Sequence, residues 1–374
     1  MPTLRGWAVL TASLTTLILG LAVGYRELTT LGGVGTLAVA LAAGWVALPM
    51  RLAVDRSVEP DRVVRDDPCC AVLNLHSASR RTRVVTVADR VRGPAGERSV
   101  TAGPMRVRGG IPARATYDLP TDRRGLLTVG PLWIATRDPL GLCGSRRSLG
   151  AEARLLVRPR WHPLRGVPLG VAPSLDGPTD AALHGTIVFH TLREYQLGDD
   201  LRHVHWRTSA RLGTLMVRQH IDAARPRLAV LVDDRAEAYL DDAGVVEEAI
   251  EVAASIVVAA QRTGLPLLLG LTSWAEATDE PAAGLDLLAR VQPRLDVDPL
   301  VAMHRLRMAT AGATLVFVTG PGSDLRPVLA DRAAYAELVV VMLGVTVASA
   351  PADITLLPVA TAADFADSWE RLLS

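Results

Sequence analysis

The stretch VVEEAIEVAASIVVAAQRTGLPLLLGLT, residues 245–272, decides the fold of the C-terminal half of the chain. Residues 245–264 carry apolar side chains at helical spacing and end at Gly264, which predicts an amphipathic helix. The apolar run at 265–272 is typical of a strand buried on both faces. A helix that leads directly into a buried strand predicts an α/β domain with a parallel sheet core.

The same alternation of strands and helices extends through residues 214–374. We expect the other strands at residues 214–221, 227–234, 313–320, 337–345 and 353–360. These elements predict a doubly wound domain, whose ligands bind at the carboxyl ends of the strands. Asp233 and Asp234 close one strand, and Asp324 follows another, so these ends are candidate sites. No GxGxxG sequence follows a strand, so a dinucleotide site is not supported.

The N-terminal region, residues 1–50, predicts a membrane hairpin. Residues 7–25 and 28–50 carry no charge, and each run is long enough to cross about 30 Å of hydrocarbon. Only Arg26 and Glu27 separate them. A cleaved signal peptide is the weaker interpretation, because the first run is long, lacks a small-residue cleavage site and leads into a second span.

The charges that flank the hairpin predict its orientation. Arg5 precedes the first span, and Arg51 and Arg56 follow the second, whereas the short connection is neutral overall. Under the positive-inside rule both termini and the soluble domains face the cytoplasm. We therefore expect a multi-pass protein of the inner or cell membrane.

Residues 51–160 predict a β-rich, sandwich-like domain. Short β-branched runs alternate with segments rich in glycine and proline, a pattern typical of small antiparallel sandwiches. Several arginines gather between Arg80 and Arg90. They could contact lipid headgroups or an acidic partner. The favoured interpretation is a solvent-exposed edge strand whose charged residues prevent pairing with another strand, since acidic residues lie nearby. A linker rich in proline and glycine, residues 161–185, follows this domain.

Composition excludes several classes of chemistry. The 374 residues include 40 basic ones, all arginine, against 39 acidic ones, for a net charge of +1. Without lysine there is no Walker-A phosphate loop and no Schiff-base chemistry. The balanced charge and the lack of a series of stacking aromatics argue against a nucleic-acid partner. The three cysteines have no framework spacing and are expected to be reduced thiols.

The densest mixture of charged and aromatic residues is LREYQLGDDLRHVHWRTSARLG, residues 192–213, here called the hallmark segment. Together with the preceding linker it occupies residues 161–213, between the two folded domains. We expect a turn at Gly198, with Asp199 as the N-cap of a helix over residues 200–211 that ends at Gly213. The candidate interdomain or docking residues are Arg193, Tyr195, Gly198, Asp199, Arg202, His205, Trp206, Arg207, Ser209 and Arg211.

Three roles are open to the hallmark segment. Arginines pair rigidly with carboxylates, so an ionic junction that fixes one domain against the other is favoured. Arginine and tryptophan are also enriched at binding hot spots, so the same residues would suit a docking surface. Catalysis by His205 with Ser209 is the third hypothesis. It is disfavoured because Ser209 lies in no nucleophile elbow and the arginines keep nearby carboxylates paired.

Two segments resemble the family called domain of unknown function 58. The hallmark segment is similar to that family's pattern R-x-Y-x-x-G-D-x-x-R-x-I-x-W-(K/R)-x-(S/T)-A-R. YDLPTDRRGLLTVGPLWIATRDPLGL, residues 117–142, is similar to its RRG…GP…DP(F/L)GL segment. The matching positions in this second segment are Arg124, Gly125, Gly130, Pro131, Asp138, Pro139 and Gly141.

This resemblance implies a two-helix membrane anchor, a β-sandwich and a domain like von Willebrand factor A. It also implies a partnership with a MoxR-type AAA+ ATPase and with membrane proteins, because members are often encoded beside them. The family has no generally established activity. The non-enzymatic adaptor proposed from it would anchor to the bilayer through residues 7–50 and help assemble or remodel envelope proteins.

One departure bears on metal binding. Metal-competent von Willebrand A domains carry D-x-S-x-S after the first strand, and their oxygens bind a hard divalent cation. Counted from Asp233, the hydroxyl positions hold Arg235 and Glu237, so we expect no metal and no cofactor. Asp233, Asp234 and Asp324 remain weak candidate ligands. A ligand- or metal-binding module that uses Asp233 and Asp234 is the first alternative to the adaptor, and an enzyme that uses His205 is the second.

Overall fold

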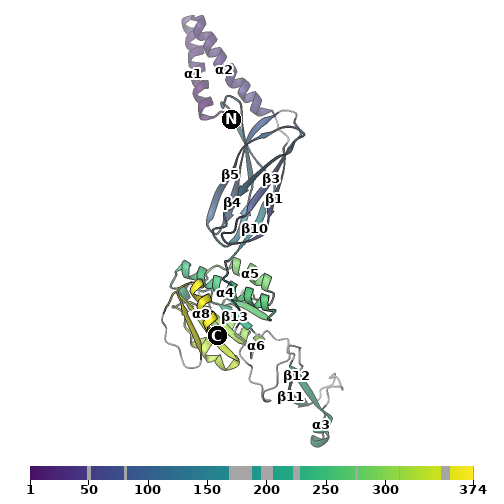
Figure 1. Cartoon of the computed structure of the whole chain (residues 1–374). Helices are drawn as coiled ribbons and strands as arrows, with labels where there is room; N and C mark the ends of the chain where they lie inside the picture. The colour runs from purple at the N-terminus through teal and green to yellow at the C-terminus, as the bar shows by residue number, and fades with distance from the viewer. Residues whose placement is uncertain are drawn as a thin grey trace. The chain divides into compact units, whose positions relative to one another are not determined.

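The chain forms two compact units, Met1–Arg158 and Pro159–Ser374. Figure 1 shows the elements of both units, coloured from purple at the N-terminus to yellow at the C-terminus. The computed structural model describes residues 1–48, 52–79, 82–167, 188–194, 205–221, 228–273, 277–295, 297–310, 312–346 and 354–373.

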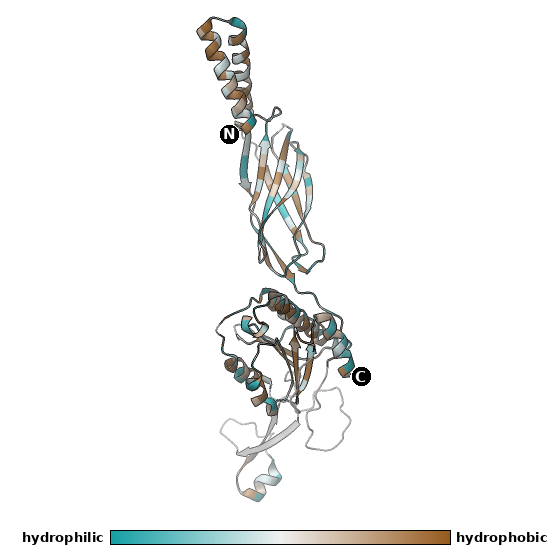
Figure 2. Cartoon of the chain, turned by 90° about the vertical axis from the view of Figure 1, so that its left-hand side faces the viewer, coloured by the Kyte–Doolittle hydropathy of each residue, from teal (hydrophilic) through white to brown (hydrophobic). Residues whose placement is uncertain are grey.

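The first unit begins with two apolar helices, α1 (Leu4–Val23) and α2 (Arg26–Ala47). Each is long and apolar enough to cross a membrane, as the sequence predicts. Figure 2 shows the hairpin largely in brown and white, with hydrophilic residues at its turn. The helices pack closely through glycines: a Cβ atom at Gly32 would lie 2.4 Å from the backbone nitrogen of Leu17.

The remainder of the first unit is built of strands, as predicted for residues 51–160. They are β1 (Leu52–Glu59), β2 (Arg62–Val64), β3 (Cys70–Ser77), β4 (Arg83–Gly93), β5 (Gly96–Val107), β6 (Ala113–Asp118), β7 (Gly125–Val129), β8 (Leu132–Arg137), β9 (Gly144–Leu149) and β10 (Ala153–Arg158). One sheet has the order β1-β3-β6 and the other β2-β10-β7-β4-β8-β9, with β5 paired to β4.

The two β-sheets share one hydrophobic core. Leu73 of β3, Val85 of β4 and Leu155 of β10 are fully buried members of it. Along β4, buried and more exposed residues alternate because successive side chains of a strand point to opposite faces. This alternation explains why short β-branched runs were sufficient to locate the β-rich region.

The second unit contains a six-stranded mixed sheet with the order β15-β14-β13-β16-β17-β18. Its strands are β13 (Leu228–Val232), β14 (Leu267–Leu271), β15 (Ala277–Thr278), β16 (Thr314–Thr319), β17 (Glu337–Leu343) and β18 (Thr355–Val359). All neighbours pair in parallel except β15, which pairs antiparallel with β14. The predicted α/β domain with parallel strands is therefore present.

Helices contribute to hydrophobic clusters on both faces of this sheet. They are α4 (Ala243–Thr263), α5 (Pro281–Arg290), α6 (Pro299–Thr310), α7 (Arg326–Ala330) and α8 (Ala362–Leu373). Val230 of β13 belongs to the cluster formed with α4, α5 and α8, whereas its neighbour Leu231 belongs to the cluster formed with α6 and α7. Both faces of β13 are buried, which explains its purely apolar sequence.

Three local expectations need correction. Residues 214–221 were expected in the α/β sheet, but β12 (Met216–Ile221) pairs antiparallel with β11 (Val188–Glu194) in a separate two-stranded sheet. The residue types of such a run indicate a strand without specifying its partner. The hallmark helix, α3 (Trp206–Leu212), begins after His205, which caps it in place of Asp199.

Part of the predicted linker is packed against the α/β domain. Leu164 belongs to a hydrophobic core, and Trp369 Nε1 of α8 donates a hydrogen bond of 2.9 Å to the Gly166 carbonyl. Apolar residues among the prolines explain this packing, since they bury surface that an irregular solvated linker would expose. Residues 168–187 of this stretch lie outside the described residues.

Candidate functional site

The most elaborate polar cluster lies at the carboxyl ends of three adjacent strands. Asp233 and Asp234 follow β13, Thr272 follows β14, and Thr319 ends β16. In the sheet, β13 lies between β14 and β16, so the chain leaves β13 toward one side and later returns on the other. Ligands of doubly wound sheets bind at such a switch point. The Asp233 cluster denotes Asp233, Asp234, Arg235, Thr272, Thr319 and Ser323.

Arg235 binds Asp233 through two parallel hydrogen bonds. Its Nε donates to Asp233 Oδ1 and its Nη2 to Oδ2, each over 2.8 Å. The Asp233 side chain has no exposed surface, and that of Arg235 is 8% exposed. Such a bidentate pair is stronger than a neutral hydrogen bond and fixes both side chains. The hydrogen bonds to Asp233 raise the pKa of Arg235 against the opposing effect of burial, so the guanidinium stays charged.

Hydroxyl groups complete the surroundings of Asp233. Thr319 Oγ1 and Ser323 Oγ donate to Oδ2 over 2.8 and 3.1 Å, and Thr272 Oγ1 lies 3.1 Å from Oδ1. Tyr239 donates its hydroxyl proton to the Asp233 backbone carbonyl over 2.7 Å. Burial raises the pKa of this tyrosine well above its usual value, so it remains a neutral donor. Both oxygens of the buried Asp233 carboxylate therefore accept hydrogen bonds from protein groups.

Asp234 is less completely satisfied. Its Oδ1 accepts hydrogen bonds from Thr272 Oγ1 (2.7 Å) and from the Ser273 backbone (2.8 Å). Its Oδ2 is buried and accepts no hydrogen bond from the described residues. The Arg294 Nε lies 3.9 Å from this oxygen, beyond hydrogen-bond distance, on a side chain that is 54% exposed. Asp234 is therefore the member of the cluster with remaining capacity to bind another group.

The oxygen atoms of the Asp233 cluster resemble the ligands of a divalent cation only in part. Two carboxylates and three hydroxyls are the oxygen ligands that magnesium or calcium prefers. However, the Arg235 guanidinium lies where a cation would have to approach Asp233. Asp324 does not join the cluster: its carboxylate binds Arg326 over 2.7 Å, and this hydrogen bonding lowers its pKa. The Asp233 cluster with Arg235 in place therefore fits a metal poorly.

Two glycines allow the loop after β16 to approach the cluster. A Cβ atom at Gly320 would lie 2.4 Å from the Ala238 carbonyl oxygen, and one at Gly322 would lie 2.3 Å from that of Glu237. This close approach brings Ser323 onto Asp233. The hydroxyl residues Thr272, Thr319 and Ser323 were not identified individually from sequence. The sequence feature that could have identified them is their position, because each ends or follows an apolar strand.

The described part of the hallmark segment is a capped helix. His205 is the N-cap of α3, and its Nδ1 accepts a hydrogen bond from the Thr208 backbone over 3.3 Å. Ser209 Oγ donates to the His205 carbonyl (3.1 Å) and accepts from the Met216 backbone (2.8 Å). The predicted helix end at Gly213 is confirmed, with a left-handed backbone (φ 71°). The polar contacts of His205 and Ser209 are therefore local.

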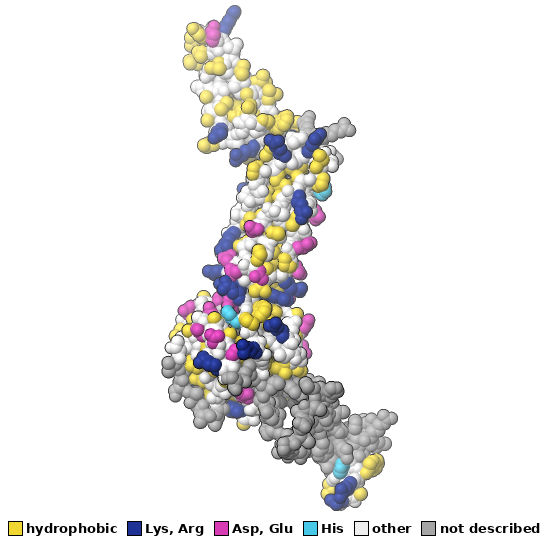
Figure 3. All heavy atoms as spheres, viewed as in Figure 1, with side chains coloured by type: hydrophobic (Ala, Val, Ile, Leu, Met, Phe, Trp, Pro, Cys, Tyr) yellow, Lys and Arg dark blue, Asp and Glu magenta, His cyan; other side chains and the backbone are white. Residues whose placement is uncertain are grey.

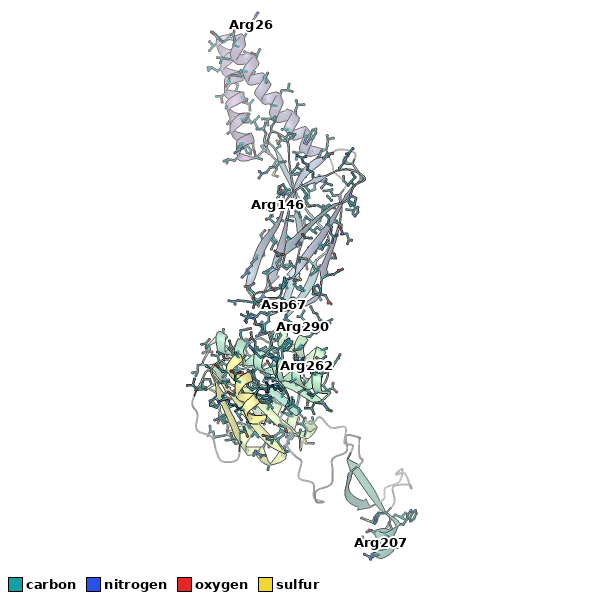
Figure 4. The ribbon with its side chains drawn as sticks, viewed as in Figure 1. Arg26, Asp67, Arg146, Arg207, Arg262 and Arg290 are labelled. Carbon is teal, nitrogen blue, oxygen red and sulfur yellow. The ribbon has the colours of Figure 1, made fainter. Side chains whose placement is uncertain are left out.

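Large apolar and basic side chains of α3 are exposed. Trp206 is 64% exposed and Leu212 is 61% exposed. Arg207 and Arg211 are also exposed and lie on the same short helix, as Figure 4 shows for Arg207. Arg193 belongs to β11, where its backbone pairs with Val217. The remaining predicted residues of this segment, which lie outside the described residues, are Tyr195, Gly198, Asp199 and Arg202.

The comparison with protein families matches this part of the chain. Residues 191–282 match the family described as "Protein of unknown function DUF58". They form a DUF58 domain. The match covers the hallmark segment and the Asp233 cluster as far as Thr272. It therefore agrees with the resemblance that the sequence motifs indicated.

The other comparisons do not extend this family assignment. No curated protein matches the chain. Solved structures that match include the CARDB domain of the PF1109 protein from Pyrococcus furiosus, with 11% identity, 29% of this chain and 88% of that chain covered, and a TM-score of 0.20. The putative ApaA protein from Bordetella pertussis matches with 12% identity, coverage of 29% and 95%, and a TM-score of 0.23.

The second family segment lies outside the DUF58 match, in the β-rich region. Its glycines have positive φ angles that disfavour a side chain: 135° at Gly125, 123° at Gly130 and 70° at Gly141. Arg124 is buried, Pro131 follows a cis peptide bond, and Pro139 is exposed.

Asp138 organises the loop at residues 138–144, here called the Asp138 loop. Its carboxylate is buried and accepts hydrogen bonds from the Leu140 and Cys143 backbones over 2.8 and 2.5 Å. The Asp138 loop also holds the start of α1, because the Thr3 backbone donates to the Leu142 carbonyl over 2.8 Å. This segment therefore joins the β-rich region to the apolar hairpin.

Proposed function

We propose that the protein is a membrane-anchored, non-enzymatic adaptor whose cytoplasmic DUF58 domain binds a protein partner without a divalent metal. The observation that carries this proposal is the bidentate pair between Arg235 and Asp233 at the switch point of the sheet. The Arg235 guanidinium is part of the chain. It supplies the positive charge that a bound divalent cation would supply in a metal-competent von Willebrand A domain. The binding module would therefore be assembled without a cofactor.

The apolar hairpin supports the membrane anchor. Both helices are long enough to span a bilayer, and arginines flank them on the side that would face the cytoplasm. The β-rich region and the DUF58 domain would then lie in the cytoplasm. In this arrangement the hairpin retains the adaptor at the inner or cell membrane, where envelope proteins are assembled.

A MoxR-type AAA+ ATPase is the proposed partner. The chain lacks lysine and therefore a phosphate loop, so ATP hydrolysis would have to come from the partner. Exposed Trp206 and Leu212, beside Arg207 and Arg211, are suited to a partly apolar, acidic docking surface. The resemblance of the motifs to the DUF58 family suggests which ATPase class to test first.

Affinity purification of the tagged full-length protein from its native membrane tests the proposal. We expect an AAA+ ATPase to be enriched above a control that carries only the hairpin. Trp206→Ala should abolish the enrichment, whereas Trp161→Ala, which alters an exposed tryptophan outside the hallmark segment, should retain it. Absence of the ATPase, under conditions that preserve other membrane complexes, would contradict the adaptor proposal.

Asp234 favours a second candidate function, a metal- or ligand-binding module. Its buried Oδ2 accepts no hydrogen bond from the described residues and would suit an added ligand. Calorimetric titration of the solubilised full-length protein with magnesium or manganese separates the two proposals. A micromolar site that Asp234→Asn removes would support the module. Heats equal to buffer dilution would support the metal-free adaptor.

A further inference from the structure

A cavity of about 270 Å³ lies in the first unit, where the last turn of α2 meets strands β8 and β9. Its volume is close to the lower bound of about 300 Å³ for small-ligand sites. Its lining residues are Val46, Leu48, Leu52, Arg83, Ile134, Thr136, Ser145, Arg147 and Leu149.

The wall of this cavity combines an apolar part with a basic part. Val46, Leu48 and Leu149 belong to the apolar part, and Val46 lies in the last turn of α2. Thr136 and Ser145 add hydroxyl groups, and Arg83 and Arg147 add positive charge. An apolar surface at the end of an apolar helix, next to two guanidinium groups, matches the division of a phospholipid into chains and an anionic headgroup.

Arg83 is fixed at the level where α2 ends. Its side chain donates from Nη2 to the Trp45 carbonyl over 2.8 Å, and its guanidinium carbon lies 5.6 Å from the centre of the Trp45 ring. The residue is 8% exposed. Tryptophan is enriched at the membrane–water interface, so Trp45 indicates that Arg83 lies at headgroup depth.

Positive charge is unbalanced at this end of the β-rich region. Arg137, Arg146 and Arg147 are exposed, and none forms an ion pair with a carboxylate of the described residues. Ion pairs between arginines and carboxylates at the surface of this unit include Arg62–Asp61, Arg90–Glu97, Arg92–Glu152 and Arg98–Asp122. Figure 3 shows basic side chains near the base of the hairpin, and Figure 4 places Arg146 toward that end of the β-rich region and Asp67 at the other.

We propose that this cavity binds the headgroup of an anionic phospholipid. The phosphate would lie between Arg83 and Arg147, with Thr136 and Ser145 as additional donors. The acyl chains would extend along Val46 and Leu48 and remain in the bilayer, because the cavity is too small for a whole lipid. The inference rests on the membrane anchor within the proposed function and is independent of any ATPase partner.

Native mass spectrometry of the full-length protein in detergent tests this site. The probes are phosphatidylglycerol, phosphatidylcholine of equal chain length, and soluble glycerol phosphate. We expect phosphatidylglycerol to bind at least tenfold more tightly than either of the other two. Arg147→Ala should weaken this binding about fivefold or more, as expected for one arginine near an anionic headgroup.

Arg146→Ala is the matched control, because Arg146 is the neighbouring exposed arginine and does not line the cavity. Its guanidinium carbon instead lies 4.5 Å from the centre of the Trp133 ring. Equal loss of binding in both variants, or equal binding of the two lipids, would overturn the proposed site. Glycerol phosphate that binds as tightly as phosphatidylglycerol would overturn the lipid as its ligand. Because no ATPase is present, these results do not depend on the adaptor experiment.

Discussion

At the scale of single residues, Arg235 is the side chain on which the Asp233 cluster depends. Its removal would leave a buried carboxylate without its counter-charge. We expect Arg235→Met to destabilise the α/β domain by about 3–5 kcal/mol, the usual result of breaking a buried ion pair from one side. Faster hydrogen exchange of the β13 and β16 amides would measure this loss. Arg326→Met breaks an exposed pair and should leave that exchange unchanged.

A gain of metal binding would show that Arg235 excludes a cation. Arg235→Ser combined with Glu237→Ser places hydroxyl groups at the positions that D-x-S-x-S requires. Beside Asp233, Thr319 and Ser323 they would offer an oxygen site to manganese. We expect manganese to raise the Tm of this double variant and to leave that of the parent unchanged. Equal effects on both proteins would contradict this explanation.

His205 allows a capping role to be distinguished from a catalytic one. Its side chain accepts a hydrogen bond from the Thr208 backbone at the start of α3, a task that asparagine also performs. His205→Ala should destabilise the hallmark helix by about 1 kcal/mol, and His205→Asn should restore it. Complementation of a deletion strain then separates the roles. Function that returns with asparagine supports capping, and loss in both variants supports catalysis.

At the scale of elements, the glycines of the hairpin predict how tightly its helices are held. A Cβ atom at Gly32 would meet the Leu17 backbone, whereas one at the adjacent Gly33 would meet nothing within 4 Å. Gly32→Val should therefore separate the helices and lower the Tm of the solubilised protein by several degrees. Gly33→Val provides the control and should have little effect. A similar decrease for both variants would mean that helix propensity, not packing, is responsible.

Elements with strong periodicity were predictable from the sequence, and their partners were not. The apolar run that forms β14 indicated a buried strand. The apolar face of α4 and the glycine at its end, Gly264, indicated a helix. β12 was predicted as a strand but pairs with β11, since a run of strand-forming residues does not encode its partner. The departure at Arg235 was visible in the sequence. The approach of Thr272, Thr319 and Ser323 to Asp233 depends on strand order and loop geometry, which no local pattern specifies.

At the scale of the whole molecule, the flanking charges predict the side of the membrane on which the folded units lie. We expect protease added to spheroplasts to leave both units intact, and protease added to inverted vesicles to digest them. A periplasmic marker should show the opposite pattern and serve as the control. Cleavage in spheroplasts would place the units outside the cytoplasm and would contradict the proposed ATPase partner.

The bond between Thr3 and the Asp138 loop has a consequence for synthesis. Thr3 Oγ1 donates to the Leu142 carbonyl across 139 residues of sequence. At about 5–20 residues per second, the ribosome makes the second partner on the order of ten seconds after the first. If the hairpin spans the bilayer as proposed, it would therefore insert before the loop that fixes its base exists. Insertion of the hairpin and fixing of its base by the Asp138 loop would then be separate events in time, and a chain that stalls between them would hold its spans in place without this support.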